Sequence, residues 1–215
     1  MYGLKYEPFF SGVAGGGFVI ETDDEWGKVV DMTGKPSPTV TLIYKSSRDT
    51  FEYPSFLNKV TGKSGLLFAL RHGDTHRFGA FINGPITPPA DPAKTNGYKV
   101  PVFFFSLSGA YDAPTKIEIH EERQRVRVAG TQGAVKVKGD NGEPLANVAI
   151  GKGYLWLGFA QPGPAADLSR CQQWIKKEQL PAGFSGERDK DGDGTLAQSD
   201  NFTCDQMEVY HVQVK

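Results

Sequence analysis

Alternating aspartates near the carboxyl-terminal end of the chain have the spacing of a metal-binding loop. Asp189, Asp191 and Asp193 are followed by Gly194 and Thr195, in the order found in an EF-hand calcium loop. Calcium takes six to eight oxygen ligands at about 2.3–2.6 Å, and alternate carboxylates on a tight turn supply them. The sharpest turn is expected at Gly194, the sixth position. The sequence predicts one bound calcium ion, with the ligands Asp189, Asp191, Asp193, Thr195 and Asp200.

Two of these ligands depart from the usual set. Thr195 would contribute its backbone carbonyl, and Asp200 replaces a bidentate glutamate at the twelfth position, so its shorter carboxylate should lower the affinity. Pro181 and residues 183–186 exclude a continuous helix before the loop. The alternative is an exposed acidic turn, because Asp and Gly are also favoured in solvated turns. If calcium binds, we expect it to order the insertion 181–200 and to fix the path of the last strand.

Histidine and serine clusters elsewhere match no complete metal or catalytic site. His72 and His76 flank a predicted hairpin turn without a fourth ligand nearby in sequence, so we expect a polar turn there. Residues 46–49 contain two serines, but no histidine has a spacing that would mark a catalytic triad. Arg48 and Asp49 are expected to bond to loop backbone groups. The chain also has neither a phosphate-binding loop nor a dinucleotide fingerprint.

The charge balance provides no overall attraction to nucleic acid or anionic lipid. The chain has 24 Lys and Arg against 25 Asp and Glu, and its formal net charge is −1. A local basic face is predicted on two adjacent strands, where positive residues recur at alternate positions. Its members are Arg123, Arg125, Arg127, Lys136 and Lys138. Because no aromatic residues stand between them, we expect a solvated or protein-docking surface and no nucleic-acid partner.

The composition indicates one folded, strand-rich domain covering residues 1–215. Of these residues 39% are hydrophobic, and 26 glycines and 14 prolines indicate many turns. Cys171 and Cys204 are the two cysteines, which is too few for a disulfide scaffold or a cysteine-based zinc site. The sequence shows no signal peptide and no apolar run long enough to span a membrane. We therefore expect a cytoplasmic protein.

Two short helices are predicted in the first third of the chain. Thr22 to Glu25 form a capping box, and the apolar residues that follow recur at helical spacing before Gly34. A second helix should begin at Pro54 and end at Gly62. Residues 40–47 between them have the composition of a strand.

Strands are predicted for most of the remaining chain. A hairpin should join residues 65–72 to 77–83, and a proline-rich exposed loop should follow over 84–97. The run 100–107 is too continuously apolar to have a wet face, so we expect a central strand covered on both sides. Period-2 alternation predicts further strands at Ile117/Ile119, Val126/Val128 and Val135/Val137, and a strand pair at 147–159.

Five segments resemble the TLDc family in type and order. Residues 42–51 (LIYKSSRDTF) are similar to the family's Leu-Tyr-Arg-Ala-Ser-Arg-Asp-Gly-Phe segment, and 77–81 (RFGAF) to its Phe-Gly-Gly-Tyr strand. Residues 102–107 (VFFFSL) resemble its apolar core strand, 171–180 its Cys-x-Thr-Phe segment and 201–210 its closing strand. The resemblance covers about residues 20–215, and the acidic insertion interrupts it.

The resemblance implies both a fold and a function. The fold would be an α+β arrangement of two packed antiparallel β-sheets, sandwich-like and flanked by a few short helices. The family's roles are oxidation resistance, which is protection against oxidative stress, and binding of the vacuolar proton-pumping ATPase. We therefore expect a non-catalytic binding and regulatory domain with a calcium loop. The alternatives are an enzyme that handles oxidants or small substrates, or a structural scaffold component of a large assembly.

Overall fold

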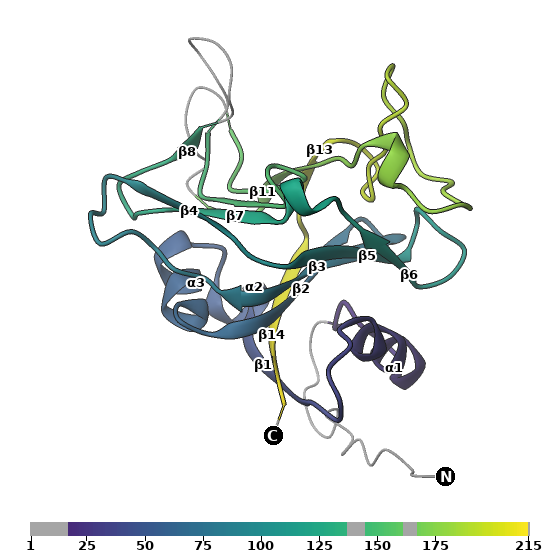
Figure 1. The fold of residues 1–215 in the computed structure, drawn as a ribbon, viewed down its shortest axis with the longest axis horizontal. Helices are drawn as coiled ribbons and strands as arrows, with labels where there is room; N and C mark the ends of the chain where they lie inside the picture. The colour runs from purple at the N-terminus through teal and green to yellow at the C-terminus, as the bar shows by residue number, and fades with distance from the viewer. Residues whose placement is uncertain (1–16, 137–144, 161–166, 215) are drawn as a thin grey trace.

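Two six-stranded antiparallel sheets form the body of the molecule (Figure 1). The computed structural model describes residues 17–136, 145–160 and 167–214. Sheet 1 contains, in spatial order, β1 (Thr39–Lys45), β14 (Gln206–Gln213), β2 (Ser64–His72), β3 (His76–Pro85), β5 (Val102–Ser108) and β6 (Thr115–Glu118). Sheet 2 contains β13 (Asn201–Thr203), β12 (Arg170–Gln173), β11 (Leu155–Leu157), β10 (Val148–Ile150), β7 (Arg125–Ala129) and β4 (Thr95–Lys99). A short ribbon of β8 (Val135–Lys136) and β9 (Leu145–Ala146) adjoins sheet 2.

Within the described ranges the helices are few and short. The α-helices are α1 (Asp23–Met32), α2 (Ser46–Asp49) and α3 (Tyr53–Val60), and the 3-10 turns are η1 (Glu121–Arg123) and η2 (Lys177–Gln179). Helix α1 starts at its predicted cap, where Thr22 Oγ1 accepts a hydrogen bond from the Glu25 amide at 3.1 Å. Helix α3 has its proline in the first turn, as expected.

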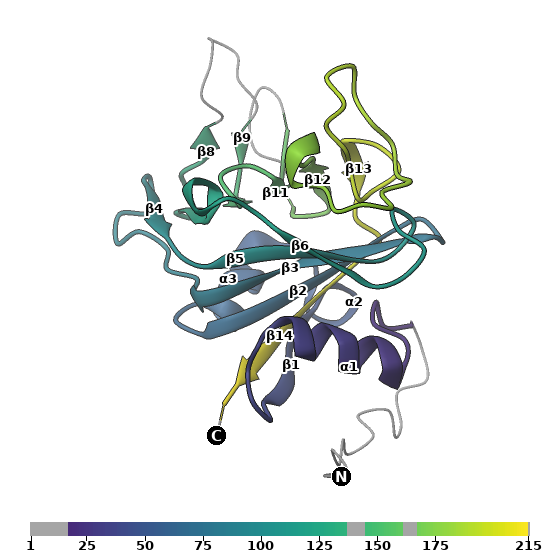
Figure 2. The same cartoon turned by 45° about the vertical axis from the view of Figure 1, so that its right-hand side comes forward.

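Sheet 1 is covered on both faces, so the molecule has two apolar cores. On strand β5, Phe104 faces sheet 2 and belongs to the larger core, whereas Phe103 and Phe105 belong to the core against α1. Figure 2 shows α1 on the side of sheet 1 away from sheet 2. Since strand side chains alternate between faces, only a continuously apolar strand fills both cores. The prediction of a doubly covered strand at 100–107 is confirmed.

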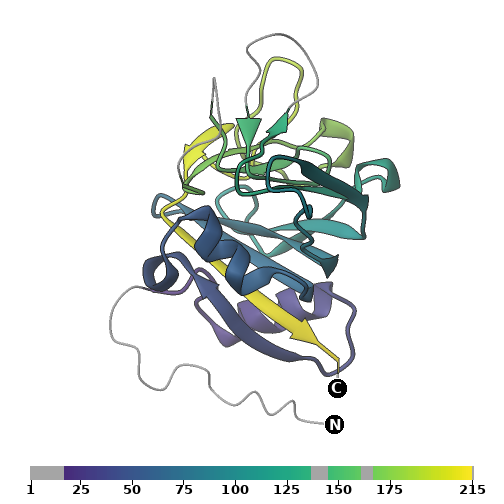
Figure 3. The same cartoon turned by 90° about the vertical axis from the view of Figure 1, so that its left-hand side faces the viewer.

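Helix α3 closes the larger core at one edge of sheet 1. Phe56 lies edge-on against Tyr44 of β1, with ring centroids 5.4 Å apart, and tilts against Phe68 of β2 at 6.1 Å. Figure 3 shows this helix lying along the side of the sheet. Burying one such ring stabilises the folded state by about 1.5–3 kcal/mol. The apolar residues of this short helix are therefore spaced so that they all face the core.

The predicted hairpin, the two helices and the strand pair at 147–159 are confirmed, with two corrections. Residues 46 and 47 begin helix α2 instead of extending the strand before them, because Asp49 turns back to accept the Lys45 amide at 3.0 Å. The exposed loop predicted over 84–97 gives way at Thr95 to strand β4, which pairs with β7. Strand β8 contains Val135, and Val137 lies outside the described residues.

The carboxyl-terminal quarter of the chain connects the two sheets. After β12 the chain passes through η2 and the acidic loop, returns to sheet 2 as β13, and then crosses to sheet 1 as β14. Strand β14 pairs with both β1 and β2 in the interior of sheet 1. The acidic loop therefore leads directly into the segment that joins the sheets.

Candidate functional site

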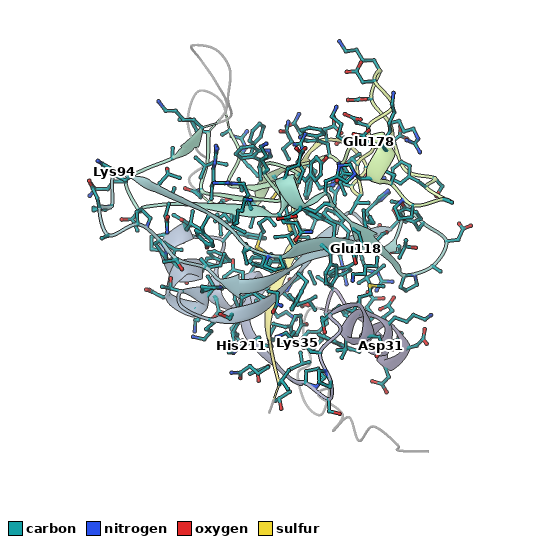
Figure 4. All side chains as sticks on the ribbon, in the orientation of Figure 1. Asp31, Lys35, Lys94, Glu118, Glu178 and His211 are labelled. Atoms are coloured by element: carbon teal, nitrogen blue, oxygen red, sulfur yellow. The ribbon has the colours of Figure 1, made fainter. Side chains whose placement is uncertain are left out.

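The acidic loop projects from the end of sheet 2 next to η2, and Glu178 marks η2 in Figure 4. Asp189 folds back on this loop, because its Oδ1 accepts hydrogen bonds from the amides of Asp191 at 2.8 Å and Asp193 at 3.0 Å. Such an Asx turn holds the backbone in a tight bend. The Asp191 side chain is exposed. One end of the predicted ligand set is thus preorganised by the loop's own amides.

Asp193 is the most enclosed of the predicted carboxylate ligands, and it is already paired. Its Oδ2 accepts a hydrogen bond from Lys176 Nζ at 2.7 Å, and its Oδ1 accepts one from the Lys177 amide at 3.1 Å. Burial alone would raise the pKa of Asp193, but these two bonds and the charge of Lys176 lower it below its usual value. The cations that neutralise this carboxylate come from the chain itself.

Thr195 and Asp200 occupy different surroundings. Thr195 is buried, and its hydroxyl donates to Gln173 Oε1 at 3.0 Å. Asp200 is half-buried, and its pKa is raised by burial and then by the negative charges of Asp189 and Asp193. Asp189 and Asp193 are thus close enough to Asp200 for their negative charges to disfavour its ionisation.

The predicted ligands supply the oxygen donors that calcium prefers, but they do not converge on one point. Across residues 17–136, 145–160 and 167–214, no three His, Cys, Asp or Glu side chains form a group that could hold a metal ion. Asp193 is bonded to Lys176, and Lys177 Nζ donates to the backbone carbonyl of Asp191 at 3.0 Å. In this conformation the residues do not fit a bound calcium ion.

The turn chemistry of the loop differs from the expectation. The left-handed backbone lies at Gly192, with φ of +85°, and not at Gly194. Gly194 is required for another reason: a Cβ atom there would approach Leu180 Cδ1 to 2.8 Å and would also meet the Phe184 ring. The glycine at the sixth position therefore permits close packing under the loop.

A groove of about 680 Å³, lined by both polar and apolar side chains, adjoins the end of this loop. It is lined by His72, Phe159, Ala160, Arg170, Cys171, Gln172, Asn201, Phe202 and Thr203. The bonds from the Gln173 amide to the Asp200 carbonyl and from the Cys204 amide to the Ser169 carbonyl set the pairing of β12 with β13. In this register the amides and carbonyls of Asn201 and Thr203 point away from β12. Among the described strands, β13 is an edge of sheet 2.

The two hairpin histidines are directly opposite one another but form no metal site with the described residues. His72 Nδ1 accepts a hydrogen bond from the Gln198 amide at 3.2 Å, and its ring lies against Phe202 at 5.2 Å. His76 bonds to Thr75 Oγ1 through Nδ1 at 2.9 Å. Burial and the neighbouring His72 lower the pKa of His76. His72 instead connects the hairpin to the acidic loop.

Within residues 46–49, Asp49 bonds to the backbone, and the predicted basic residues do not gather into one face. Asp49 accepts from the Lys45 amide, as expected for a loop-bonding residue. Arg123 does not join the predicted basic face, because it lies in η1 and stacks over Tyr154 at 4.7 Å. Arg127 is exposed beside Lys136, and Lys138 lies outside the described residues. The five positive charges therefore do not form one row.

Sequence reasoning missed a buried ion pair on β14. Glu208 is 0% exposed and lies 3.5 Å from Lys45 Nζ. It also accepts hydrogen bonds from the Val19 amide at 3.0 Å and from Tyr210 Oη at 2.7 Å. Burial raises the pKa of Glu208, and these partners only partly offset that effect. The one available signal was a glutamate within the apolar run 207–210.

Comparison with known proteins identifies one matching family. The family model described as the TLDc domain matches residues 20–213. A search of curated proteins found no match. No helix among the described residues is long and apolar enough to cross a membrane.

Proposed function

The chain belongs to the TLDc domain family, and from this premise we propose that it is a non-catalytic binding and regulatory domain. The match over residues 20–213 is the observation that carries the proposal, because it covers both sheets and both cores. Fold alone does not specify function, so the proposal also needs a surface that can bind. The groove at β12 and β13 is the candidate surface.

The surface chemistry supports a polar and reversible interaction. Within the described ranges, Val214 is the one large hydrophobic side chain that is exposed. Obligate interfaces are rich in exposed apolar residues, whereas transient ones are about as polar as the rest of the surface. A partner would therefore meet charged and hydrogen-bonding groups, including Arg170, Asn201 and the outward amides of β13.

We propose the vacuolar proton-pumping ATPase as that partner, in keeping with the family's role in oxidative-stress protection. The test measures binding of the purified chain to the isolated ATPase, together with ATP hydrolysis. Arg170→Glu reverses the charge of a side chain that lines the groove, so it should weaken binding. Arg127→Glu is the matched control, because it reverses an exposed charge elsewhere on sheet 2. Absence of wild-type binding would refute the ATPase proposal, and equal loss in both variants would refute the groove.

We also propose that the acidic loop binds one calcium ion in competition with Lys176. The ligands would be Asp189, Asp191, Asp193, Asp200 and the Thr195 carbonyl. Support comes from the oxygen donor types and from the mutual electrostatic influence of Asp189, Asp193 and Asp200. The Lys176 ammonium group lies 2.7 Å from Asp193, where an entering cation would have to displace it. Affinity should be modest for this reason.

Calorimetric titration of calcium, with magnesium as the control ion, tests this competition. Lys176→Met removes the ammonium group but keeps most of the stem, so it should bind calcium more tightly than wild type. The triple variant Asp189→Ala, Asp191→Ala, Asp193→Ala should not bind. If neither wild type nor Lys176→Met binds calcium, the loop is an acidic turn and the calcium proposal fails.

Calcium binding would act on the groove through β13. The loop ends at Asp200, whose carbonyl accepts the Gln173 amide at 2.8 Å, and β13 begins at the next residue. Fixing the loop should slow hydrogen exchange in β13 and alter affinity at the groove. Exchange rates in β13 that are the same with and without calcium would contradict this coupling.

A further inference from the structure

The two cysteines of the chain lie on neighbouring segments of sheet 2. Cys171 is in β12, opposite Phe202 of β13. Cys204 follows β13 immediately, and its amide bonds to the carbonyl of Ser169 at 2.7 Å. Cys171 and Cys204 therefore occupy diagonal positions on one face of the β12–β13 pair. Both are free thiols, 2% and 1% exposed.

The two thiols lie on the same face of this strand pair, and each bonds to a nearby backbone carbonyl. Cys171 Sγ donates to the Leu168 carbonyl at 3.3 Å, and Cys204 Sγ donates to the Gln206 carbonyl at 3.1 Å. Each thiol thus has its own backbone acceptor, and the Cys204 thiol is near enough to Cys171 to contribute to raising the pKa of Cys171. Two buried thiols on one face of neighbouring strands can react with each other once one of them is oxidised.

We propose that Cys171 and Cys204 form a reversible intramolecular disulfide when a peroxide oxidises the chain. This inference does not depend on the proposed binding function or on calcium. Neither the family match nor the donor pattern of the acidic loop assigns a role to this thiol pair.

The reaction balances with one peroxide molecule. The Cys171 thiolate attacks one peroxide oxygen, the O–O bond breaks, and water leaves after the released hydroxide takes up a proton. Cys171 is then a sulfenic acid. The Cys204 sulfur attacks that sulfur, the S–O bond breaks, and a second water leaves with the Cys204 proton. Two thiols are oxidised to a disulfide, and hydrogen peroxide is reduced to two waters.

The surroundings of Cys171 identify it as the first thiol to react. It lines the groove together with His72 and Arg170, whereas Cys204 is not among the residues that line it. Burial, followed by the neighbouring Cys204 thiol, raises the pKa of Cys171. The thiolate is the reactive form, so the reaction should be slow at neutral pH and faster as pH rises.

Forming the bond should move the end of β13. Diagonal neighbours on antiparallel strands have Cα atoms about 7–8 Å apart, slightly beyond the usual reach of a disulfide. Cys204 lies just past β13, and its amide still bonds to the Ser169 carbonyl of the neighbouring chain segment. The bond should draw Cys204 toward β12 and strain the crossing to β14, and strained disulfides are easily reduced.

The test treats the reduced 215-residue chain with hydrogen peroxide. Remaining thiols are then blocked with N-ethylmaleimide, and the intact mass is measured after unfolding. We expect loss of two hydrogen atoms, no maleimide label, a linked peptide containing both cysteines, and reversal by dithiothreitol. The rate should increase between pH 7 and pH 9. Labelling of both thiols, or oxygen addition to Cys171 while Cys204 stays labelled, would overturn the proposal.

Single variants and an unfolded control test whether the fold positions the pair. Cys171→Ala and Cys204→Ala keep small apolar side chains at both buried sites, and circular dichroism checks that each variant folds. In each variant the intact mass should not fall by two hydrogen atoms, because the remaining thiol has no second cysteine in the chain to bond with. If the disulfide forms in urea as fast as in the folded chain, the fold does not position it and the proposal fails.

Discussion

At the scale of single residues, burial decides how much an ion pair affects the free energy of unfolding. Glu208 and Lys45 form an ion pair inside the molecule, whereas Glu118 and Lys116 form one at the surface. Exposed pairs contribute about 0–1 kcal/mol, but removing one partner of a buried pair costs about 3–5 kcal/mol because the other charge is left unpaired. Asp193 and Lys176 lie between these cases, since only the aspartate is well buried.

Glu208→Ala should therefore be much more destabilising than Glu118→Ala. Loss of Glu208 leaves the Val19 amide, the Tyr210 hydroxyl and the Lys45 ammonium group without this acceptor. We expect the free energy of unfolding to fall by about 3–5 kcal/mol for Glu208→Ala and by less than about 1 kcal/mol for Glu118→Ala. Urea denaturation measures both, and equal losses would contradict the importance of burial.

Glu208 should also make stability depend on pH. Its folded pKa is raised above the ordinary value of 4.5, so the folded state binds its proton more tightly than the unfolded state. The contribution of Glu208 to the free energy of unfolding then decreases as pH rises through the interval between the two pKa values. In the Glu208→Gln variant the side chain at position 208 has no ionisable group, so this pH dependence should be absent. Wild type should gain stability relative to Glu208→Gln as pH falls through that interval, as followed by urea denaturation at each pH.

At the scale of elements, local sequence set most boundaries, and side-chain contacts set the exceptions. The capping residue and apolar spacing of α1 were sufficient to place it. The start of strand β4 was expected to be loop, and residues 46 and 47 of α2 were expected to be strand, because the pairing with β7 and the bond from the Lys45 amide to Asp49 are contacts that local sequence does not show. Short elements have little intrinsic preference, so such contacts decide them.

Two glycines at α1 provide a matched test of this element. A Cβ atom at either Gly27 or Gly34 would meet nothing within 4 Å, but only Gly34 has a left-handed backbone, with φ of +67°. Gly27→Ala should stabilise the protein by about 0.5–1 kcal/mol because it stiffens the unfolded chain. Gly34→Ala should destabilise it. Thermal unfolding measures both, and a change of the same sign would contradict the backbone explanation.

At the scale of the whole molecule, sheet 1 contributes side chains to both apolar cores. The last quarter of the chain runs from the exposed edge of sheet 2 into the interior of sheet 1. Phe104 and Phe105 are adjacent, yet they belong to different cores. The acidic loop, the groove and both cysteines all lie along the path from β12 to β14. A change in this segment can therefore reach both the exposed edge of sheet 2 and the interior of sheet 1.

Truncating each phenylalanine should loosen a different layer. Either change should cost about 3–5 kcal/mol because it removes a fully buried ring. Phe104 packs against Tyr154 with ring centroids 6.2 Å apart, so Phe104→Ala should increase hydrogen exchange mainly in β10 and β11. Phe105→Ala should increase it mainly in α1. Identical exchange patterns in the two variants would show that the cores are not separate layers.

Residue patterns along the chain were enough to predict the family, the β-rich fold, the hairpin and the doubly covered strand, because these depend on periodicity and on residue order. It also gave the donor types of the acidic loop. The pairs Lys176–Asp193, Cys171–Cys204 and Lys45–Glu208 became visible only in the folded chain. Each of these pairs joins residues far apart in sequence, and their meeting depends on strand register and loop path, which no local pattern encodes.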